Sequence, residues 1–153
     1  CDKVVINSQA LRNIKLIKDA VDVFGSQAIV ASVDFKLVGK EYKIYNHAEH
    51  DICQTNFLDH IDNVFSAGVG ELVLSSVDAD GELTGYDLDI LSFLPETNVP
   101  LLINGGCGKP EHMKNAFRNK ISGCCAGSIF YYSEYGYRDI KEYLISNSIR
   151  VRA

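Results

Sequence analysis

Short apolar runs with β-strand propensity alternate with segments of helical periodicity along the chain, and this alternation constrains the fold more than any other feature. Several runs are apolar on successive residues, the pattern of strands buried on both faces of a parallel sheet. The predicted strands are Val4–Asn7, Ala28–Lys36, Glu71–Val77, Leu101–Asn104 and Gly123–Gly127. This order predicts parallel strands joined by right-handed helical crossovers.

Helical segments fill the intervals between these strands. Apolar residues at helical spacing predict helices over residues 16–24 and 57–65, which end at Gly25 and Gly68. Weaker helices are predicted over Asp87–Leu94, Pro110–Phe117 and Tyr137–Ser146.

The alternation fits either an open doubly wound sheet or a (β/α) barrel. An eight-unit barrel typically needs about 250 residues, whereas this chain has 153 residues and five units. We therefore predict one α/β domain over residues 1–153, a partial (β/α)8 TIM barrel of about five βα units. The chain opens on Cys1, just before a core strand, and we expect the barrel to lack N-terminal units.

Charge and cysteine content argue against several function classes. The net charge is −5 without a stripe of lysine or arginine, so no nucleic-acid partner is expected. No apolar stretch approaches the length of a membrane span, so no membrane association is expected. Five cysteines without paired or zinc-ribbon spacing predict free thiols and a cytoplasmic protein.

Asp34 stands at the end of the apolar run from Ala28 to Val33. A carboxylate at the mouth of a buried strand is a candidate for chemistry because burying it is costly. The alternatives are a cap of the next helix or an ion pair with Lys36. Four more predicted strands end in polar or glycine residues, and parallel barrels build their active sites at this rim.

Glycine turns follow the last two predicted strands. The run from Ile103 to Pro110 contains Gly105 and Gly106 before a helix start, and Gly127-Ser128 closes the next strand. Backbone amides exposed by glycine bind phosphate, although a tight turn also explains the glycines. Neither a Walker lysine nor a full dinucleotide fingerprint is present, which argues against nucleoside triphosphates and NAD.

Two further polar segments follow strands. Asp80 is a possible second acid opposite Asp34, and an Asp-Gly turn with Gly81 is its alternative. Asn7-Ser8 ends the first strand, where a second anionic group would bind, although an asparagine N-cap explains the pair equally well.

The connection from Leu37 to Thr55 is too long for a βα turn, and loops of that size are commonly lids or mobile. Alternation over residues 40–45 predicts a small hairpin arm. His47, His50 and Cys53 follow at three-residue intervals. Because there is no obvious fourth ligand, we interpret them as solvated loop residues rather than a zinc site, and no metal or other cofactor is expected.

Taken together, these motifs resemble the HisF family, the cyclase subunit of imidazole glycerol phosphate synthase, over nearly the whole chain. The matching stretches are Asp2–Ser8, Phe24–Gln27, Val33–Asp34, Gly68–Gly81, Gly85–Asp87, Gly105–Lys109 and Ile140–Leu144.

The resemblance implies the fourth to eighth strands of a (β/α) barrel. Members of the family use ammonia, released by a glutaminase partner and passed through the barrel, in histidine biosynthesis. They cleave and cyclise a phosphoribulosyl-formimino aminoimidazole carboxamide ribotide. The products are imidazole glycerol phosphate and aminoimidazole carboxamide ribotide.

The resemblance also implies roles for individual residues. Asp34 is similar to one of two general acid/base aspartates, and Asp80 to an acid that lines the substrate pocket. Four residues resemble those of one phosphate site of the family: Gly105, Gly106, Gly127 and Ser128. Asn7 and Ser8 resemble part of the other phosphate site. The residues similar to the charged ring that admits ammonia are Lys3 and Glu71.

Three departures from the family pattern bear on function. The second catalytic aspartate belongs on the first barrel strand, so we expect residues 1–153 alone to be inactive in cyclisation. Residues 46–55 replace a loop that is glycine-rich and contains threonine in the family, and Asn104 replaces a small residue.

Two other functions stay open from the sequence. One is a related barrel of surface-polysaccharide synthesis, which uses ammonia to amidinate a sugar. The other is a non-catalytic half-barrel that binds phosphorylated ligands. Because a partial barrel leaves open edges and apolar surface, self-association is also expected.

Overall fold

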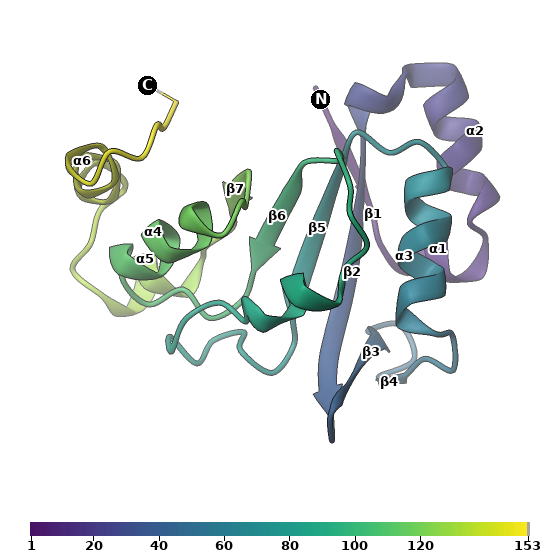
Figure 1. Cartoon of the computed structure of the whole chain (residues 1–153), viewed down its shortest axis with the longest axis horizontal. Coiled ribbons are helices and arrows are strands. Elements are labelled where there is room, and N and C mark those ends of the chain that lie inside the picture. The colour runs from purple at the N-terminus through teal and green to yellow at the C-terminus, as the bar shows by residue number, and fades with distance from the viewer. Residues whose placement is uncertain (153) are drawn as a thin grey trace.

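The computed structural model describes residues 1–152 as one sheet with helices packed along it (Figure 1). The strands are β1 (Val4–Ile6), β2 (Ile29–Val38), β3 (Glu41–Asn46), β4 (Asp51–Ile52), β5 (Glu71–Ser76), β6 (Leu101–Asn104) and β7 (Gly123–Cys124). The α-helices are α1 (Ser8–Arg12), α2 (Lys15–Phe24), α3 (Phe57–Ser66), α4 (Pro110–Arg118), α5 (Ser128–Tyr132) and α6 (Tyr137–Ser146). Two 3-10 helices complete the order, η1 (Ser26–Ala28) and η2 (Asp89–Phe93).

The strand β2 organises the sheet. One edge of β2 pairs with β5 in parallel, while residues of its other edge pair first with β1 in parallel and then with β3 in antiparallel orientation. Strands β6 and β7 follow β5, both in parallel. The predicted parallel α/β arrangement is confirmed, and the sheet is open, as in a partial (β/α) barrel.

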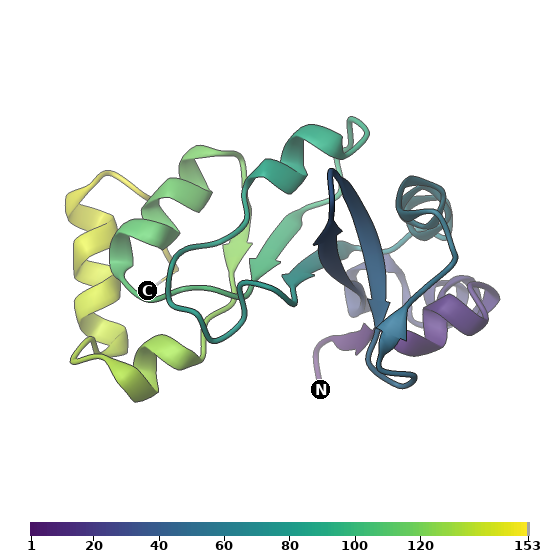
Figure 2. The same ribbon diagram turned by 90° about the horizontal axis from the view of Figure 1, so that it is seen from below.

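The helices cover the outer, convex face of the curved sheet and leave the inner face open (Figure 2). On β5, Leu72 and Leu74 are fully buried, whereas Val73 and Ser75 between them are half-buried. The prediction that several strands are buried on both faces is confirmed for residues 29–35 of β2, which are all buried, and is wrong for β5, because helices cover one face of an open sheet.

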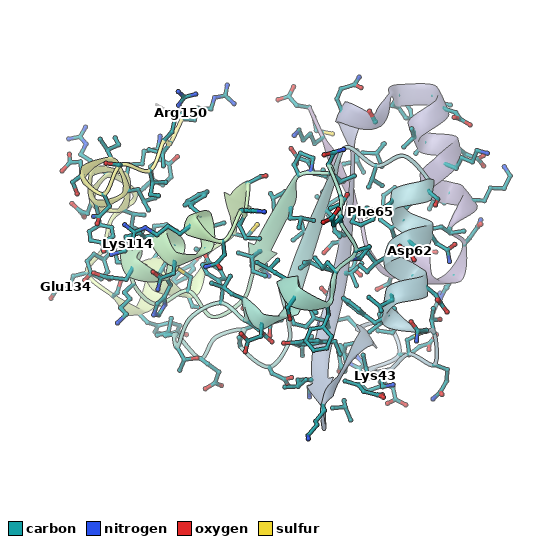
Figure 3. The ribbon with its side chains drawn as sticks, in the orientation of Figure 1. Lys43, Asp62, Phe65, Lys114, Glu134 and Arg150 are labelled. Carbon is teal, nitrogen blue, oxygen red and sulfur yellow. The ribbon has the colours of Figure 1, made fainter. Side chains whose placement is uncertain are left out.

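The helix α3 illustrates how the outer layer forms. Asn56 caps it, since its side chain accepts hydrogen bonds from the backbone amides of Leu58 and Asp59 at 2.9 and 3.2 Å. Phe65 lies on the side that faces the sheet, while Asp62 is exposed (Figure 3). None of the helices in residues 1–152 is long and apolar enough to cross a bilayer.

The main differences from the sequence prediction concern four elements. The helix expected over residues 87–94 is only the 3-10 helix η2, because Leu94 is extended before Pro95, as residues before proline prefer. The last strand ends at Cys124 rather than at Gly127, and the short helices α1 and α5 were not predicted.

Candidate functional site

The parallel register brings the ends of three strands into one row. Asp34 of β2 pairs with Ser75 of β5, and Ser75 pairs with Asn104 of β6. The Asn104 amide donates a hydrogen bond of 3.3 Å to the Ser75 hydroxyl. Neighbouring strands lie about 4.8 Å apart, so Asp34 and the glycine turn after Asn104 share the carboxyl-terminal rim, roughly 10 Å apart.

Asp34 is a buried carboxylate held by a neighbouring side chain. Its Oδ2 accepts a hydrogen bond of 2.7 Å from Nδ2 of Asn7, which also lies 3.5 Å from the Ser32 hydroxyl. The alternative pairing with Lys36 is wrong, since the Lys36 ammonium lies 3.4 Å from Asp78 instead. Because the charge has a polar partner, its burial is tolerated in a position that faces the inner side of the sheet.

Asn7 and Ser8 connect β1 to α1. Asn7 occupies the N-cap position of α1, but its side chain makes no capping hydrogen bond. The side-chain capping alternative is therefore wrong, because the amide donates to Asp34. Ser8 is the first residue of α1, so both residues lie at the same rim as Asp34.

The long connection after β2 forms a hairpin arm, here defined as residues 37–52. Strand β2 runs past Asp34 to Val38, and β3 returns along it after Gly39, whose φ is 65°. The predicted hairpin is confirmed, and Lys43 marks β3 in Figure 3.

Tyr42 anchors the arm to the rest of the protein. Its hydroxyl donates to the Asp87 carboxylate, at 2.9 and 3.1 Å from the two oxygens. Its ring packs edge-on against Phe35 and Phe93, with centroid distances of 5.4 and 5.0 Å. Burial, together with the Asp87 charge, raises the pKa of Tyr42 well above its ordinary value.

His47 lies at the end of the arm against Asp34, a contact that the sequence interpretation missed. The Nε2 atom of His47 is 3.4 Å from Oδ2 of Asp34, and its ring packs edge-on against Tyr45 at 4.9 Å. His47 is exposed in a turn, as the interpretation as a solvated loop residue expected, but that interpretation did not include the contact with Asp34. The hairpin register explains the contact, because Phe35 pairs with Ile44, and the chain two residues after Tyr45 therefore returns to the level of Asp34.

The other two members of the histidine and cysteine triplet lie elsewhere. The Cys53 thiol lies 3.2 Å from the Thr55 hydroxyl, and His50 has a left-handed backbone with φ of 54°. Among residues 1–152, no group of three or more histidine, cysteine, aspartate or glutamate side chains is arranged to hold a metal ion.

The glycine turns of β6 and β7 meet in one small pocket. The predicted residues that line it are Asp80, Gly105, Gly106, Gly127 and Ser128. The other lining residues are Asn104, Cys107, Cys125 and Ala126. The structure thus brings all the predicted residues of this phosphate site together with Asp80.

Two of these glycines are required by the backbone. Gly105 and Gly106 have φ of 92° and 98°. A Cβ on Gly106 would lie 2.0 Å from the carbonyl oxygen of Gly85. The tight-turn explanation therefore holds for these positions, and the turn also leaves its backbone beside the pocket.

Asp80 lies in a turn after β5. Its backbone amide donates a hydrogen bond of 3.2 Å to the carbonyl oxygen of Ser76, and the following Gly81 has a φ of 84°. The Asp-Gly turn and the position beside the pocket are therefore both present.

Tyr86 lies near the thiols of Cys107, Cys124 and Cys125, and Cys107 and Cys125 also line the pocket. The Tyr86 hydroxyl donates a hydrogen bond of 2.9 Å to the carbonyl of Cys125. Burial raises the pKa of Cys107 and of Cys125, and it raises the pKa of Cys124 to about 12. Since the thiolate is the nucleophilic form, the raised pKa values disfavour nucleophilic chemistry by these three cysteines.

Lys3 and Glu71 form an ion pair at the opposite, amino-terminal end of the sheet. Lys3 precedes β1, and Glu71 begins β5, on the two sides of β2. Both side chains are partly exposed. The structure therefore brings together the two residues that were expected to belong to a charged gate.

Comparison with known proteins identifies the relatives of this chain. The family model described as "Histidine biosynthesis protein" matches residues 1–136. Imidazole glycerol phosphate synthase subunit HisF of Campylobacter concisus is 35% identical over 152 residues, and that of Pyrococcus furiosus is 36% identical over 152 residues. The HisF subunit of Wolinella succinogenes is 38% identical over 155 residues.

Each of these alignments covers 99% of this chain and 61% of the relative. The chain therefore spans about three fifths of the length of the curated relatives that it matches. The family match, the parallel half-barrel and the matching rim residues agree, and the chain belongs to the histidine biosynthesis protein family.

Proposed function

We propose that this chain carries part of the cyclase site of an imidazole glycerol phosphate synthase. In that reaction, ammonia converts the phosphoribulosyl-formimino aminoimidazole carboxamide ribotide to imidazole glycerol phosphate and aminoimidazole carboxamide ribotide. The observation that carries the proposal is the buried Asp34 on the same rim as the glycine pocket. The names of the relatives support this choice of reaction.

In this proposal Asp34 is a general acid/base that moves a proton during cleavage and ring closure. Its burial against Asn7 favours the role, because an acid/base group works best in a fixed position away from bulk water. Asn7 also contributes, with Ser8, to the binding of a second phosphate on the β1 side.

The glycine pocket is proposed to hold one phosphate of the substrate. Backbone amides around Gly105, Gly106 and Gly127 and the Ser128 hydroxyl supply donors suited to an anion. Asp80 would repel phosphate, so we assign it to a hydroxyl or amine of the substrate beside the phosphate.

We propose a glutaminase subunit as the source of ammonia. The relatives are named as one subunit of a synthase, which supports a second subunit. The Lys3–Glu71 pair lies at the end of the sheet opposite to Asp34, as an entry gate for ammonia requires. The pathway and the free thiols favour the cytoplasm as the location.

The test uses protein expressed from its complete coding sequence, supplied with ammonium salt and the ribotide. We expect formation of imidazole glycerol phosphate and its loss in Asp34→Asn. No turnover by a folded wild-type protein would contradict the proposal. An unchanged rate in Asp34→Asn would instead show that Asp34 does not take part in the reaction.

The hairpin arm favours a second candidate, the amidination of a sugar with ammonia in surface-polysaccharide synthesis. Residues 46–55 depart from the family pattern, and they bring His47 against Asp34. An assay of the same protein with ammonia and a nucleotide-linked or free sugar acid distinguishes the two candidate functions. Amidinated sugar without any turnover of the ribotide would support this candidate.

We also propose that residues 1–153, taken as a separate molecule, associate through the open sheet edges. Val4 and Val5 of the edge strand β1 are exposed hydrophobic residues. Sedimentation of this polypeptide is expected to give a dimer or larger species, and a monodisperse monomer would contradict the proposal.

A further inference from the structure

Asp34 has little access to water. Its side chain is 7% exposed, and one of its oxygens already accepts a hydrogen bond from Asn7. A general acid/base must return to its starting protonation state after each turnover, so a buried carboxylate needs a route for its proton to reach the solvent.

His47 bridges Asp34 and the solvent. Its side chain is 58% exposed, and its Nε2 atom lies 3.4 Å from Oδ2 of Asp34. Contacts of this kind are often long without substrate and shorten when it binds. An imidazole suits the task, because histidine exchanges protons with water near neutral pH and has two separate nitrogen atoms.

We propose that His47 is a proton-relay residue, which carries protons between Asp34 and the solvent. After Asp34 has taken a proton from the substrate, its O–H bond breaks, and the proton forms an N–H bond at Nε2 of neutral His47. The resulting imidazolium releases the proton on Nδ1 to water, and Asp34 is again a carboxylate. Proton exchange of the exposed ring with water then returns His47 from the Nε2–H to the Nδ1–H tautomer, which can accept the next proton. His47 therefore acts through Asp34 and does not contact the substrate.

The arm holds His47 in place for this role. The Tyr45 ring packs against His47, and Tyr42 fixes the arm through Asp87. Three other charged groups lie on the surrounding elements. Lys36 lies 5.9 Å from the centre of the Tyr45 ring, and Arg12 of α1 pairs with Glu49 of the arm at 3.5 Å.

The first test is kinetic, and it rests on the proposed function. In protein from the complete coding sequence, His47→Asn is expected to lower kcat about tenfold or more while KM changes little. Added imidazole buffer is expected to restore the rate, since it replaces the lost relay group. If His47→Asn lost activity only because the arm was disturbed, the rate would not depend on the imidazole concentration.

His50→Asn is the matched control. It removes the other histidine of the arm at a position with φ of 54°, a backbone conformation that asparagine tolerates. We expect kcat and the response to imidazole to stay at wild-type values. A rate of His47→Asn that equals wild type, or a loss that imidazole does not restore, would overturn the relay.

The second test needs no substrate. In the 15N spectrum of the histidine side chains, the Nε2 signal of His47 is expected to move in Asp34→Asn, while the His50 signals stay unchanged. An unmoved His47 signal would overturn the relay, even in a protein that turns over the ribotide. Absence of turnover in wild type would overturn the proposed reaction, while this spectrum still decides whether His47 and Asp34 are coupled.

Discussion

The two flanks of the carboxyl-terminal rim are built in different ways. On the β1–β2 flank, side chains make the site, because Asn7 and His47 both approach the Asp34 carboxylate. On the β6–β7 flank, the backbone makes the site, because Gly105 and Gly106 form a turn too tight for a side chain.

Because of this difference, substitutions on the two flanks are expected to have different effects. A side-chain site tolerates a substitution of equal size, which removes the reactive group and leaves the sheet in place. A backbone site is part of the fold, so a small side chain there disturbs the surrounding structure. Substitutions on the first flank are therefore expected to lower activity, and substitutions on the second flank are expected to lower stability.

The largest expected effect comes from Asp34→Asn. The amide oxygen still accepts the hydrogen bond from Asn7, so the unfolding free energy is expected to change by about 1 kcal/mol or less. Activity is expected to fall roughly 100- to 10,000-fold, since the proposed general acid/base is lost. Steady-state kinetics and urea unfolding measure the two quantities.

Asp78→Asn is the control for this prediction, since Asp78 pairs with the partly exposed Lys36 on the same rim. We expect near-wild-type kinetics for it. Equal losses of activity in both variants would break the comparison, because general disturbance of the rim would then explain them.

The next largest effect is expected from Gly106→Ala. The new Cβ would meet the Gly85 carbonyl oxygen at 2.0 Å, in a backbone conformation that alanine disfavours. We expect the unfolding free energy to fall by roughly 2–4 kcal/mol, as measured by urea unfolding. Gly127→Ala, at a position with nothing within 4 Å of the new Cβ, is expected to retain wild-type stability. A stable Gly106→Ala protein would contradict the assignment of this flank to the backbone.

A smaller effect is expected from Tyr42→Phe. Loss of the hydrogen bond to Asp87 is expected to cost about 1–2 kcal/mol of unfolding free energy. Because the pKa of folded Tyr42 is raised, the unfolded chain ionises first above about pH 10, so wild-type stability falls as pH rises past that value. Tyr42→Phe removes this contribution, and its urea-unfolding profile is expected to fall less steeply.

Tyr131→Phe controls for the loss of a hydroxyl alone, because Tyr131 is 86% exposed. It is expected to match wild type at every pH. A Tyr42→Phe protein that behaves in the same way would show that Asp87 does not anchor the arm.

The smallest effect is expected at the other end of the sheet, from Lys3→Met. Partly exposed ion pairs contribute little, so the unfolding free energy is expected to fall by less than about 1 kcal/mol. The difference from wild type should shrink further in high salt. If Lys3→Met lowered the unfolding free energy by several kcal/mol, the ion pair would contribute as much to stability as the glycine turn of the rim.

Local patterns in the sequence were enough to predict the main strands and helices. The β6 strand and the α6 helix begin and end at the predicted residues. The segment before Pro95 was predicted as an α-helix because its apolar residues have helical spacing, but proline geometry shortened it to η2. The β2–β3 pairing beyond Asp34 depends on contacts across the hairpin, which residue spacing alone does not give.

The candidate site was predicted in the same uneven way. Asp34 was found because it ends an apolar run, and the glycine turns because each follows a predicted strand, since parallel strands deliver these positions to one rim. The contact of Asn7 with Asp34 was missed, since an asparagine before a helix is ordinarily a cap. His47 was missed because its contact with Asp34 requires the register of the arm to be known.

The arm is a continuation of the strand that bears Asp34. Its tip around Gly39 and Lys40 lies beyond the paired residues of the parallel sheet. Mutations or insertions at that tip can alter which molecules enter the rim without breaking any parallel strand pair. This geometry provides a simple evolutionary route by which one barrel scaffold acquires a new substrate and keeps the buried carboxylate of the same strand.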